Sequence, residues 1–432
     1  MEKQDIVIVG SGCAGLFAAL QFPADKRITM ITKEIIEHSD SFLAQGGICV
    51  LKTPEDYQSF FDDTLKAGHY ENRKESVDIM IRSSWDTIRE LVSYGVDFAR
   101  AEDGTLLYTR EGAHSKPRIL YHEDETGKEI TSRLLSQVRS AHPNVQIIEN
   151  TAMVDLICQD NTCRGVVIRR ADGSYDIIPA DYTVLACGGI GGLYKHSTNY
   201  PQLTGDGLAV CMEHGVALEN INYVQIHPTT LYTKKPGRSF LISESVRGEG
   251  ALLYNAKGER FANELMPRDL LTEAIRAQMA ADGTDFVWED LRPIGEEEIK
   301  NHFPNIYARC LEEGYDVTRE CIPVTPAQHY FMGGIHVDEE SKTTMEHLYA
   351  IGETACNGVH GKNRLASNSL LESLVFAKRA ALHIIEHYTP QDGPLPAVDF
   401  SAYEPAETLA SCIISQARNY HRYFCTRSPG KL

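Results

Sequence analysis

One stretch near the N-terminus, DIVIVGSGCAGLFAALQF (residues 5–22), constrains the fold more than any other. It begins with apolar residues typical of a short buried strand, and Gly10, Gly12 and Gly15 follow at G-x-G-x-x-G spacing. The first glycine permits a tight turn, the second lets a pyrophosphate approach the backbone, and the third lets the strand pack closely against the helix expected at residues 16–22. This order of strand, turn and helix predicts a Rossmann-like dinucleotide-binding unit of the α/β class.

Two later stretches indicate which dinucleotide this unit binds. YTVLACGGIGG (182–192) and HLYAIGE (347–353) each resemble a buried strand that runs into glycine, and the second ends at Glu353. In two-part FAD sites a late strand of this form brings an acidic residue back to the ribityl chain. The pair therefore favours FAD over a nicotinamide and predicts a discontinuous FAD-binding domain. The alternative is that both are ordinary core strands of a doubly wound sheet.

The second strand of the unit, RITMIT (27–32), should be followed by an acidic residue that binds the adenosine ribose. Lys33 stands at that point and Glu34 comes next. The sequence therefore leaves the ribose contact open, and Lys33 is kept as a candidate cofactor residue.

Composition excludes several classes of function. The 432 residues carry a formal net charge of −18, which makes nucleic acid a poor partner because phosphate binding needs clustered positive charge. We expect no membrane partner, since the sequence has no apolar run of about eighteen residues and its first residues lack a signal-peptide layout. The 11 cysteines include no Cys-x-x-Cys pair, and no His-Glu-x-x-His motif is present, so we expect no metal site and a cytoplasmic location.

A polar segment, GVHGKNRLASNS (358–369), leads into an apolar helix expected from residue 369 onward. One interpretation is a well-capped helix, since Ser and Asn are favoured N-cap residues. The other is an anion and cofactor site, because a helix N-terminus offers unpaired N–H groups and Arg364 can clamp a carboxylate at two points. Motifs elsewhere in the chain favour the second interpretation.

Eight motifs carry a resemblance to a known family that covers the chain to about residue 400. They are SFLAQGGICV (41–50), TREGAHSKPRIL (109–120), TGDG (204–207), QIHPTTL (225–231), LISESVRGEGA (241–251), MPRDLLTEAI (266–275), PAQHYFMGGI (326–335) and HGKNRLASNSLLE (360–372). In this order they resemble the fumarate reductase and succinate dehydrogenase flavoproteins, a family that includes the L-aspartate oxidases.

Within that family, two positions resemble the aspartate oxidases. Membrane-linked succinate dehydrogenases carry a flavin-linking histidine where this chain has Asp40, and His38 lies two residues out of register. The resemblance therefore implies noncovalent FAD. Glu111 matches the glutamate that faces the substrate amino group in aspartate oxidases, because an ammonium needs an anion that would repel bare succinate. A solvated loop carboxylate is the alternative for Glu111.

The chemistry of L-aspartate, with two carboxylates and one ammonium, requires a site with hydrogen-bond donors for two acids and one anionic acceptor. The resemblance supplies candidates from well-separated segments, as expected for a site between two domains. The candidate catalytic residues are Arg268, His227, His329, Arg364 and Ser243 as donors, with Glu111 as the acceptor.

Arg268 matches the arginine that the family uses as a proton shuttle. Arginine stays protonated at ordinary pH, so for aspartate oxidation we expect it mainly to hold a carboxylate and to stabilise developing charge. A contact at the start of a helix capped by Asp269 is the alternative. Glu244 and Arg247 form either a relay or a structural pair, and Gln225 is expected beside the flavin edge or the substrate.

The candidate FAD residues come from the glycine turn and from the motifs of the resemblance. The backbone N–H groups of Ser369 and Leu370 would face the pyrimidine edge of the flavin, where negative charge grows on reduction and the helix dipole favours it. The full set is Gly10, Ser11, Gly12, Cys13, Ala14, Gly15, Lys33, Ser41, Ala44, Gln45, Gly46, Gly47, Val154, Asp206, Glu353, Ser369 and Leu370.

The predicted architecture is a discontinuous Rossmann-like FAD-binding domain with an inserted α+β capping domain. The expected segments are 1–220 and 332–400 for the FAD domain, 221–331 for the capping domain, and 401–432 for a C-terminal helix and tail. Closure of the capping domain about turn-rich edges at 220–222 and 333–334 would exclude water. Longer aspartate oxidases carry a C-terminal helical bundle, so the resemblance is to a short form without it.

These expectations lead to one principal function and to two alternatives. The first is FAD-dependent oxidation of L-aspartate to iminoaspartate, with hydride transfer to flavin N5, O2 or fumarate as acceptor, and quinolinate synthase as the next enzyme in NAD biosynthesis. The second is a soluble fumarate reductase or succinate dehydrogenase flavoprotein that acts on fumarate or succinate. The third, an FAD-bearing subunit for tRNA modification, is disfavoured by the acidic charge.

Overall fold

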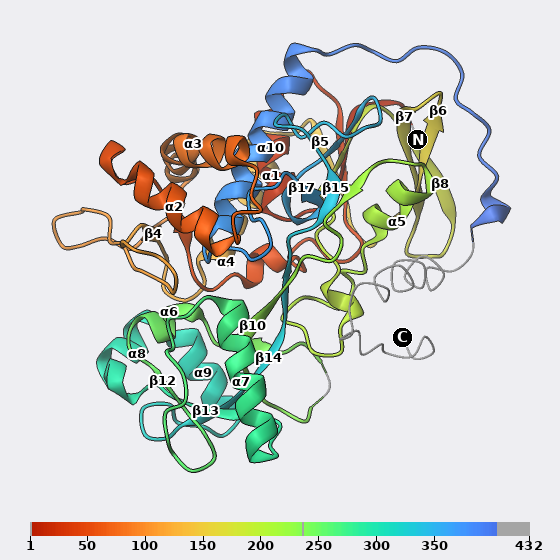
Figure 1. Ribbon diagram of the computed structural model, residues 1–432. Coiled ribbons are helices and arrows are strands. Elements are labelled where there is room, and N and C mark those ends of the chain that lie inside the picture. The colour runs from red at the N-terminus through yellow and green to blue at the C-terminus, as the bar shows by residue number, and fades with distance from the viewer. Residues whose placement is uncertain (1, 236, 404–432) are drawn as a thin grey trace.

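The computed structural model describes residues 2–235 and 237–403 (Figure 1). The expected C-terminal helix after residue 401 lies almost wholly outside these residues. Among the described helices, none combines the length and the apolar character that a bilayer span requires.

A seven-stranded sheet forms the centre of the larger lobe (Figure 1). Its first strand pairs in parallel with its neighbours on both sides, as a dinucleotide-binding unit requires, while the last two strands of the row run antiparallel. The strand order is β5 (Val145–Ile148), β2 (Ile28–Ile31), β1 (Gln4–Val9), β8 (Tyr175–Leu185), β7 (Thr162–Arg169) and β6 (Ala152–Gln159), with β16 (Leu348–Ala350) paired to β8.

Both faces of this sheet are buried, which explains why its strands are apolar at successive positions. Along β1, Ile6 and Ile8 pack into a core with the helices α1, α3, α4 and α10, while Val7 and Val9 pack into a second core that includes α5. The helices of this lobe are α1 (Cys13–Gln21), α2 (Tyr57–Ala67), α3 (Lys74–Ser93), α4 (Thr126–Ala141), α5 (Asp206–Glu213) and α10 (Asn368–Glu386). The prediction of an α/β fold with a Rossmann-like sheet is confirmed.

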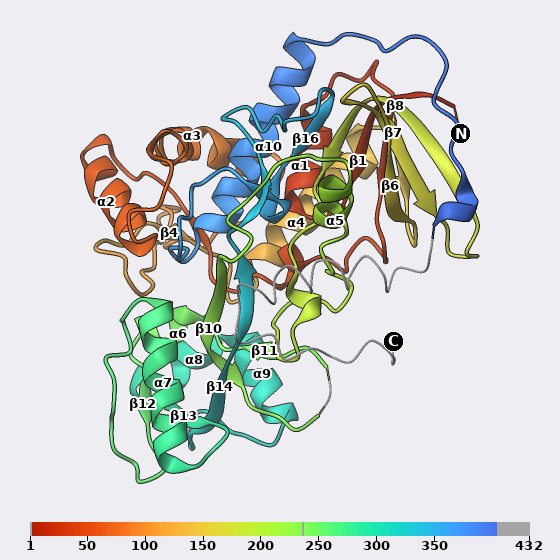
Figure 2. The same ribbon diagram turned by 45° about the vertical axis from the view of Figure 1, so that its right-hand side comes forward.

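A second, antiparallel sheet forms the smaller lobe, which we call the cap (Figure 2). Its core contains only cap residues, such as Leu253, Leu271 and Val324. The sheet order is β11 (Phe240–Leu241), β10 (Val224–Leu231), β14 (Ile322–Phe331), β13 (Val287–Asp290) and β12 (Leu252–Tyr254). Its helices are α6 (Glu244–Gly248), α7 (Arg268–Asp282), α8 (Glu296–His302) and α9 (Pro304–Glu312).

The two connections between the lobes lie side by side. A Cβ atom added to Gly333 would lie 2.1 Å from the carbonyl oxygen of Asn220, which itself has a left-handed backbone with φ 50°. A small sheet of β9 (Leu218–Glu219), β15 (Gly334–His336) and β17 (Ala355–Cys356) secures this crossing. The segment boundaries at 221 and 331, and closure about these connections, stay predictions.

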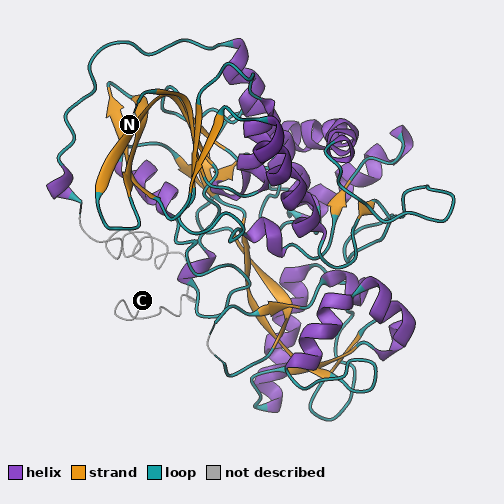
Figure 3. Ribbon diagram, turned by 180° about the vertical axis from the view of Figure 1, so that it is seen from behind, coloured by secondary structure: helices purple, strands orange, loops and turns teal. Residues whose placement is uncertain are grey.

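The cap also rests on the loop between β4 (Ile119–Leu120) and α4. Strand β4 pairs with β3 (Ile48–Cys49). Asp124 of this loop accepts hydrogen bonds from the backbone N–H groups of Asn305 at 3.2 Å and Ile306 at 2.7 Å, in the first turn of α9. A side chain of one lobe thus caps a helix of the other. Seen from behind, the strands of the large sheet lie in the upper lobe and those of the cap sheet extend into the lower one (Figure 3).

Candidate active site

One cavity brings the sequence-predicted residues together. It encloses about 1710 Å³ of space, its open mouth included. All candidate catalytic and FAD residues except Gly15 and Val154 line it, whereas Gln225, expected beside the flavin edge or the substrate, contacts two of them without lining the cavity itself. Val154 lies on β6, and its neighbours Thr151, Ala152 and Met153 form the wall there instead.

The glycine turn has the geometry that its spacing predicts. Gly10 has φ +117°, and a Cβ atom there would lie 2.1 Å from the carbonyl oxygen of Ala186. A Cβ atom on Gly15 would lie 2.3 Å from the carbonyl oxygen of Gly10, so Gly15 serves the packing of α1 on β1 rather than the cavity wall. The backbone N–H of Cys13 donates to the Ser41 hydroxyl at 3.0 Å, which joins the turn to the 41–47 loop.

Lys33 pairs with another candidate residue rather than standing free. Its Nζ donates to the Asp206 carboxylate at 2.8 Å, the Thr204 hydroxyl at 2.9 Å and the carbonyl oxygen of Gln202 at 3.0 Å. Glu34 also lines the cavity at this point. An ammonium cannot accept a hydrogen bond from a ribose hydroxyl, whereas a carboxylate such as that of Glu34 can, and the ribose contact stays a prediction.

Several polar atoms along the cavity lack a hydrogen-bond partner among the described residues, which tests whether a cofactor fits. They are Ser39 Oγ, Asp40 Oδ2, Gln45 Oε1, Asn199 Oδ1 and His227 Nε2. A buried polar atom without a partner destabilises a protein by about 1–3 kcal/mol, so a wall with five such atoms fits a polar ligand. FAD, with its hydroxyls, phosphates and ring nitrogens, supplies such partners.

Two partly exposed carboxylates belong to this wall. Asp40 accepts from the backbone N–H of Tyr200 at 2.9 Å, and burial raises its pKa to about 7. Glu353 accepts from the backbone N–H of Phe331 at 2.8 Å, and burial, reinforced by Asp40, raises its pKa to about 8. His38, which the register argument discounts as a flavin ligand, nevertheless lines the same wall and stacks on Tyr200 with 5.2 Å between ring centroids.

Two arginines meet at Gln225, in what we call the arginine region of the cavity (Arg268, Arg364, Gln225, His227, His329 and Glu111). Arg268, the first residue of α7, donates from Nη1 to Gln225 Oε1 at 2.9 Å, and Arg364 donates from Nε to the same oxygen at 3.3 Å. Arg364 also donates to the Ser369 hydroxyl at 2.7 Å, at the start of α10. Burial, and then the charge of Arg268, lower the pKa of Arg364 to about 10, so Arg364 stays cationic at neutral pH.

The alternative role of Arg268, a contact beside an Asp269 cap, is wrong in its geometry. Pro267 occupies the N-cap position of α7, and the Asp269 carboxylate instead lies 2.8 Å from Nε2 of His69 in the larger lobe. Arg268 donates from Nε to the Glu244 carboxylate inside the cavity. Its guanidinium is thus held toward the arginine region by Glu244 and Gln225 together.

The two histidines of the arginine region are neutral. Burial, followed by the charge of Arg268, holds the pKa of His227 and that of His329 well below the usual range. Nδ1 of His227 lies 2.9 Å from the carbonyl oxygen of Thr229, to which a hydrogen on Nδ1 would donate, and 3.2 Å from the backbone N–H of the same residue. The tautomer therefore decides whether Nε2, which has no partner among the described residues, accepts or donates in the cavity. The histidines are neutral in either case, and the cationic character comes from the arginines.

Glu111 is not a solvated loop residue, so that alternative is wrong. The residue is 3% exposed, and its carboxylate accepts hydrogen bonds from the hydroxyls of Ser245 and Ser367. Burial, and then repulsion from Glu244, raise the pKa of Glu111. Glu244 differs, because Arg268 and Arg247 hold its pKa below the usual range although burial opposes them.

Ser243 and Arg247 are placed by local structure. The Ser243 hydroxyl accepts from the backbone N–H of Ser245 at 3.3 Å and so caps α6, while it also lines the cavity. Arg247 donates to the Thr229 hydroxyl at 3.0 Å and lies 3.9 Å from the Glu244 carboxylate. The open choice between a relay and a structural pair for Glu244 and Arg247 stays open, since this geometry serves both.

Sequence reasoning missed part of the wall. Thr198, Asn199, Arg238 and Tyr330 line the cavity, and Thr198 holds Nδ1 of His329 at 2.7 Å. Tyr330 follows His329 directly in the chain, so the sequence could have indicated that Tyr330 lies in the cavity wall. The others come from irregular loops that carry no periodicity and no motif.

Comparison with known proteins decides the family. A model of the family described as FAD binding domain matches residues 5–370. An L-aspartate oxidase of Clostridium perfringens is 49% identical over 381 residues, which are 88% of this chain and 86% of that protein. The chain belongs to this FAD-binding family, among the L-aspartate oxidases.

A second relative and a solved structure extend the comparison of this family member beyond Clostridium. The L-aspartate oxidase of Pseudomonas aeruginosa is 40% identical over 422 residues, which cover 92% of this chain and 78% of that one. A solved structure of quinol-fumarate reductase with menaquinol superposes with a TM-score of 0.84 at 30% identity, covering 97% of this chain and 75% of that chain. FAD is therefore the cofactor, and the chain is an FAD-dependent oxidoreductase.

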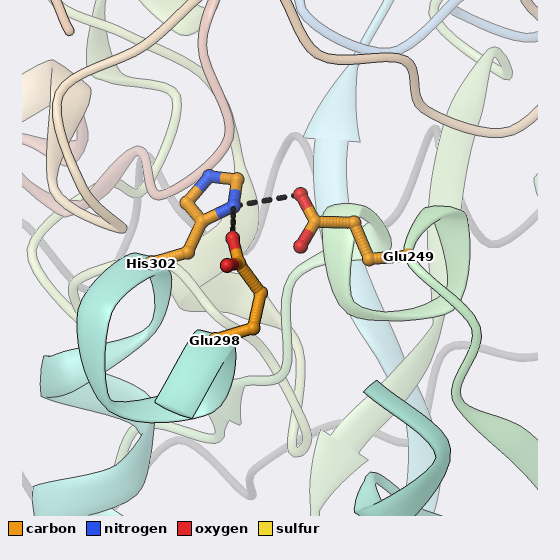
Figure 4. Close-up of side chains that lie close together, drawn as sticks. All are labelled: Glu249, Glu298 and His302. Atoms are coloured by element: carbon orange, nitrogen blue, oxygen red, sulfur yellow. Dashed lines mark ion pairs between the residues drawn. The ribbon is translucent and has the colours of Figure 1, made fainter. Parts of the chain in front are cut away.

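Outside the cavity, one group among the described residues has the composition of a metal site. Nδ1 of His302 lies 2.6 Å from the Glu249 carboxylate and 3.7 Å from that of Glu298 (Figure 4). The His302 ring also packs against Tyr121 of the larger lobe, with 4.4 Å between ring centroids. As it stands in this family member, the group is an ion pair at the seam between the lobes.

Proposed function

We propose that the chain oxidises L-aspartate to iminoaspartate with noncovalent FAD. One observation carries the proposal: a buried carboxylate, Glu111, lies in the same cavity as two buried arginines. L-Aspartate needs two cationic contacts for its carboxylates and one anionic contact for its ammonium. A site for bare succinate gains nothing from a buried anion.

The donors of the arginine region hold the two acid groups of the substrate. Arg364 and Arg268 each have a planar set of N–H donors suited to a carboxylate, and His227 and His329 add neutral polar groups beside them. Because the Glu244 carboxylate accepts from Arg268, that guanidinium keeps its proton and acts electrostatically. The flavin, when bound, accepts the hydride from the substrate α-carbon.

The anionic contact orients the amine. Ser245 and Ser367 donate to Glu111 and leave the second lone pairs of its oxygens for an ammonium. The positions of the carboxylates and of the amine together would turn the single hydrogen of the α-carbon toward the cofactor. In this proposal Glu111 sets substrate choice, and the arginines set binding.

Anaerobic mixing with substrate tests this proposal. L-Aspartate should bleach the flavin absorbance of the purified protein, and succinate should not. Bleaching by succinate with no response to L-aspartate would instead support the second candidate, a fumarate reductase or succinate dehydrogenase flavoprotein. That candidate is favoured by the likeness to quinol-fumarate reductase, and fumarate fits the same arginines as an electron acceptor.

Three further expectations belong to the proposal. Acid precipitation should release free FAD, since Asp40 cannot form the histidyl flavin bond; flavin retained in the pellet would point to His38. Quinolinate synthase is the proposed consumer of iminoaspartate. A cytoplasmic location is supported by free thiols at all the described cysteines, which suit a reducing compartment.

A further inference from the structure

A buried carboxylate outside the proposed chemistry lies just behind the arginine region. Glu372, on the second turn of α10, is 1% exposed. One of its oxygens accepts from the side-chain amide of Asn357, and the other accepts from the Ser373 hydroxyl at 3.3 Å. That second oxygen also lies 3.8 Å from Nε2 of His360.

His360 is the member of this group whose polar atoms lack hydrogen-bond partners among the described residues. It is buried, and neither of its ring nitrogens has a hydrogen-bond partner within the part of the chain that the structure describes. A neutral imidazole has one donor and one acceptor, and leaving both unused is unfavourable. A protonated ring, in contrast, would gain the nearby Glu372 carboxylate as its counter-ion.

The group is one layer of side chains away from the cavity. The Tyr330 ring lies edge-on to His360, with 5.4 Å between the two ring centroids. The guanidinium carbon of Arg364 lies 4.5 Å from the centroid of the same Tyr330 ring. Tyr330, Arg364 and Ser373 all line the cavity. Because hydride transfer needs contact between substrate and flavin, the redox-active ring must lie beside the arginine region, and therefore beside this group.

We propose that His360 takes up a proton when the flavin is reduced and that Glu372 holds the resulting imidazolium. The inference rests on the proposed function only for the position of the flavin ring. Per turnover, the substrate loses a hydride from its α-carbon and a proton from its ammonium. The flavin gains the hydride and one negative charge, and His360 gains one proton, so that charge and atoms balance.

The groups that face His360 explain why its protonation depends on the redox state of the flavin. Burial lowers the pKa of His360, Glu372 opposes that effect, and Arg364 adds to it. Tyr330 is neutral, since burial raises its pKa well above the usual range. A new unit negative charge about 8 Å away, at an effective dielectric constant of about 20, strengthens proton binding by roughly 30-fold.

The pH dependence of the flavin midpoint potential tests the proposal without using turnover. For a two-electron couple, each proton taken up adds about 30 mV per pH unit to the slope. The wild-type holoenzyme should approach about 59 mV per unit between the two pKa values of His360, a window that a roughly 30-fold change makes about 1.5 pH units wide, because hydride formation and His360 each take one proton there. His360→Gln should show about 30 mV per unit, and so should Glu372→Gln, because an uncompensated imidazolium is unfavourable at this buried position.

Each outcome decides the matter. His142→Gln, a change at a histidine on the far end of α4, should keep the wild-type slope as the matched control. A wild-type slope of about 30 mV per unit would overturn the proposal, and so would an unchanged slope of about 59 in His360→Gln. If His360→Gln loses FAD, Glu372→Gln provides the same measurement. Failure of L-aspartate to bleach the flavin would overturn the proposed function but leave this slope, and this proposal, intact.

Discussion

Replacing Glu111 with glutamine removes the anionic contact of the proposed site and little else. The amide is nearly isosteric, and the hydroxyls of Ser245 and Ser367 can rotate to donate to it or accept from it, so the buried loop keeps its packing. What is lost is a charge-assisted hydrogen bond to an ammonium, which contributes about 1.5–3 kcal/mol. A Coulomb contact of about 4 Å at an effective dielectric constant near 20 sets an upper bound of about 4 kcal/mol.

We therefore expect Glu111→Gln to lower kcat/KM for L-aspartate by roughly 30- to 150-fold, from about 2–3 kcal/mol. Fumarate has no ammonium, so reduction of fumarate by the chemically reduced enzyme should change by about threefold or less. The assays are peroxide formation with L-aspartate and dye-linked fumarate reduction, on the same preparation. Glu102→Gln, at an exposed position before the same loop, is the control. Equal losses in both reactions would refute the argument, because they would mean that Glu111 supports the loop rather than recognises the amine.

Three other substitutions test separate parts of the structure. Arg364→Leu should reduce turnover about 1000-fold or more, because a substrate carboxylate loses its buried partner. FAD should stay bound, because the glycine turn is untouched. Loss of the flavin, measured by its absorbance, would contradict this prediction. Gly10→Ala should abolish FAD retention, because the added Cβ meets the Ala186 carbonyl at 2.1 Å; a variant with normal flavin content would show the turn to be more adaptable. Burial raises the pKa of the fully buried Glu289 to about 7 from an ordinary 4.5, so the folded state keeps a proton that the unfolded chain loses between those values. Stability should then fall by about 1.4 kcal/mol per unit as pH rises through that window, and Glu289→Gln should flatten the dependence in urea titrations at pH 5 and 8, whereas the exposed Glu297→Gln should not.

The parts of the fold that follow from periodicity were predictable, and those that depend on distant segments were not. The spacing from Gly10 to Gly15 is enough to indicate a turn, because steric limits at those positions are local. The role of Lys33 was not predictable in the same way. Its position after β2 suggests the ribose, but its partner Asp206 lies 173 residues further along the chain.

The candidate site shows the same division. Residue types and the family resemblance indicated Arg268, Arg364 and Glu111, and the structure places all three on one cavity. The sequence gives no measure of burial, which decides that His227 and His329 are neutral and that Glu111 is not a solvated carboxylate. Protonation states depend on the surroundings of a group, and these surroundings are assembled only by the fold.

The bond from Asp124 to α9 limits how the cap could move away from the larger lobe. A swing that separated Asp124 from Ile306 would leave two backbone N–H groups and a buried carboxylate without partners, at about 1–3 kcal/mol for each group. Motion that keeps this contact must pivot about it. Beside Arg268, at the start of α7, the partly exposed pair of His69 and Asp269 also joins the lobes, and because water reaches this pair it resists separation less than the buried Asp124 does.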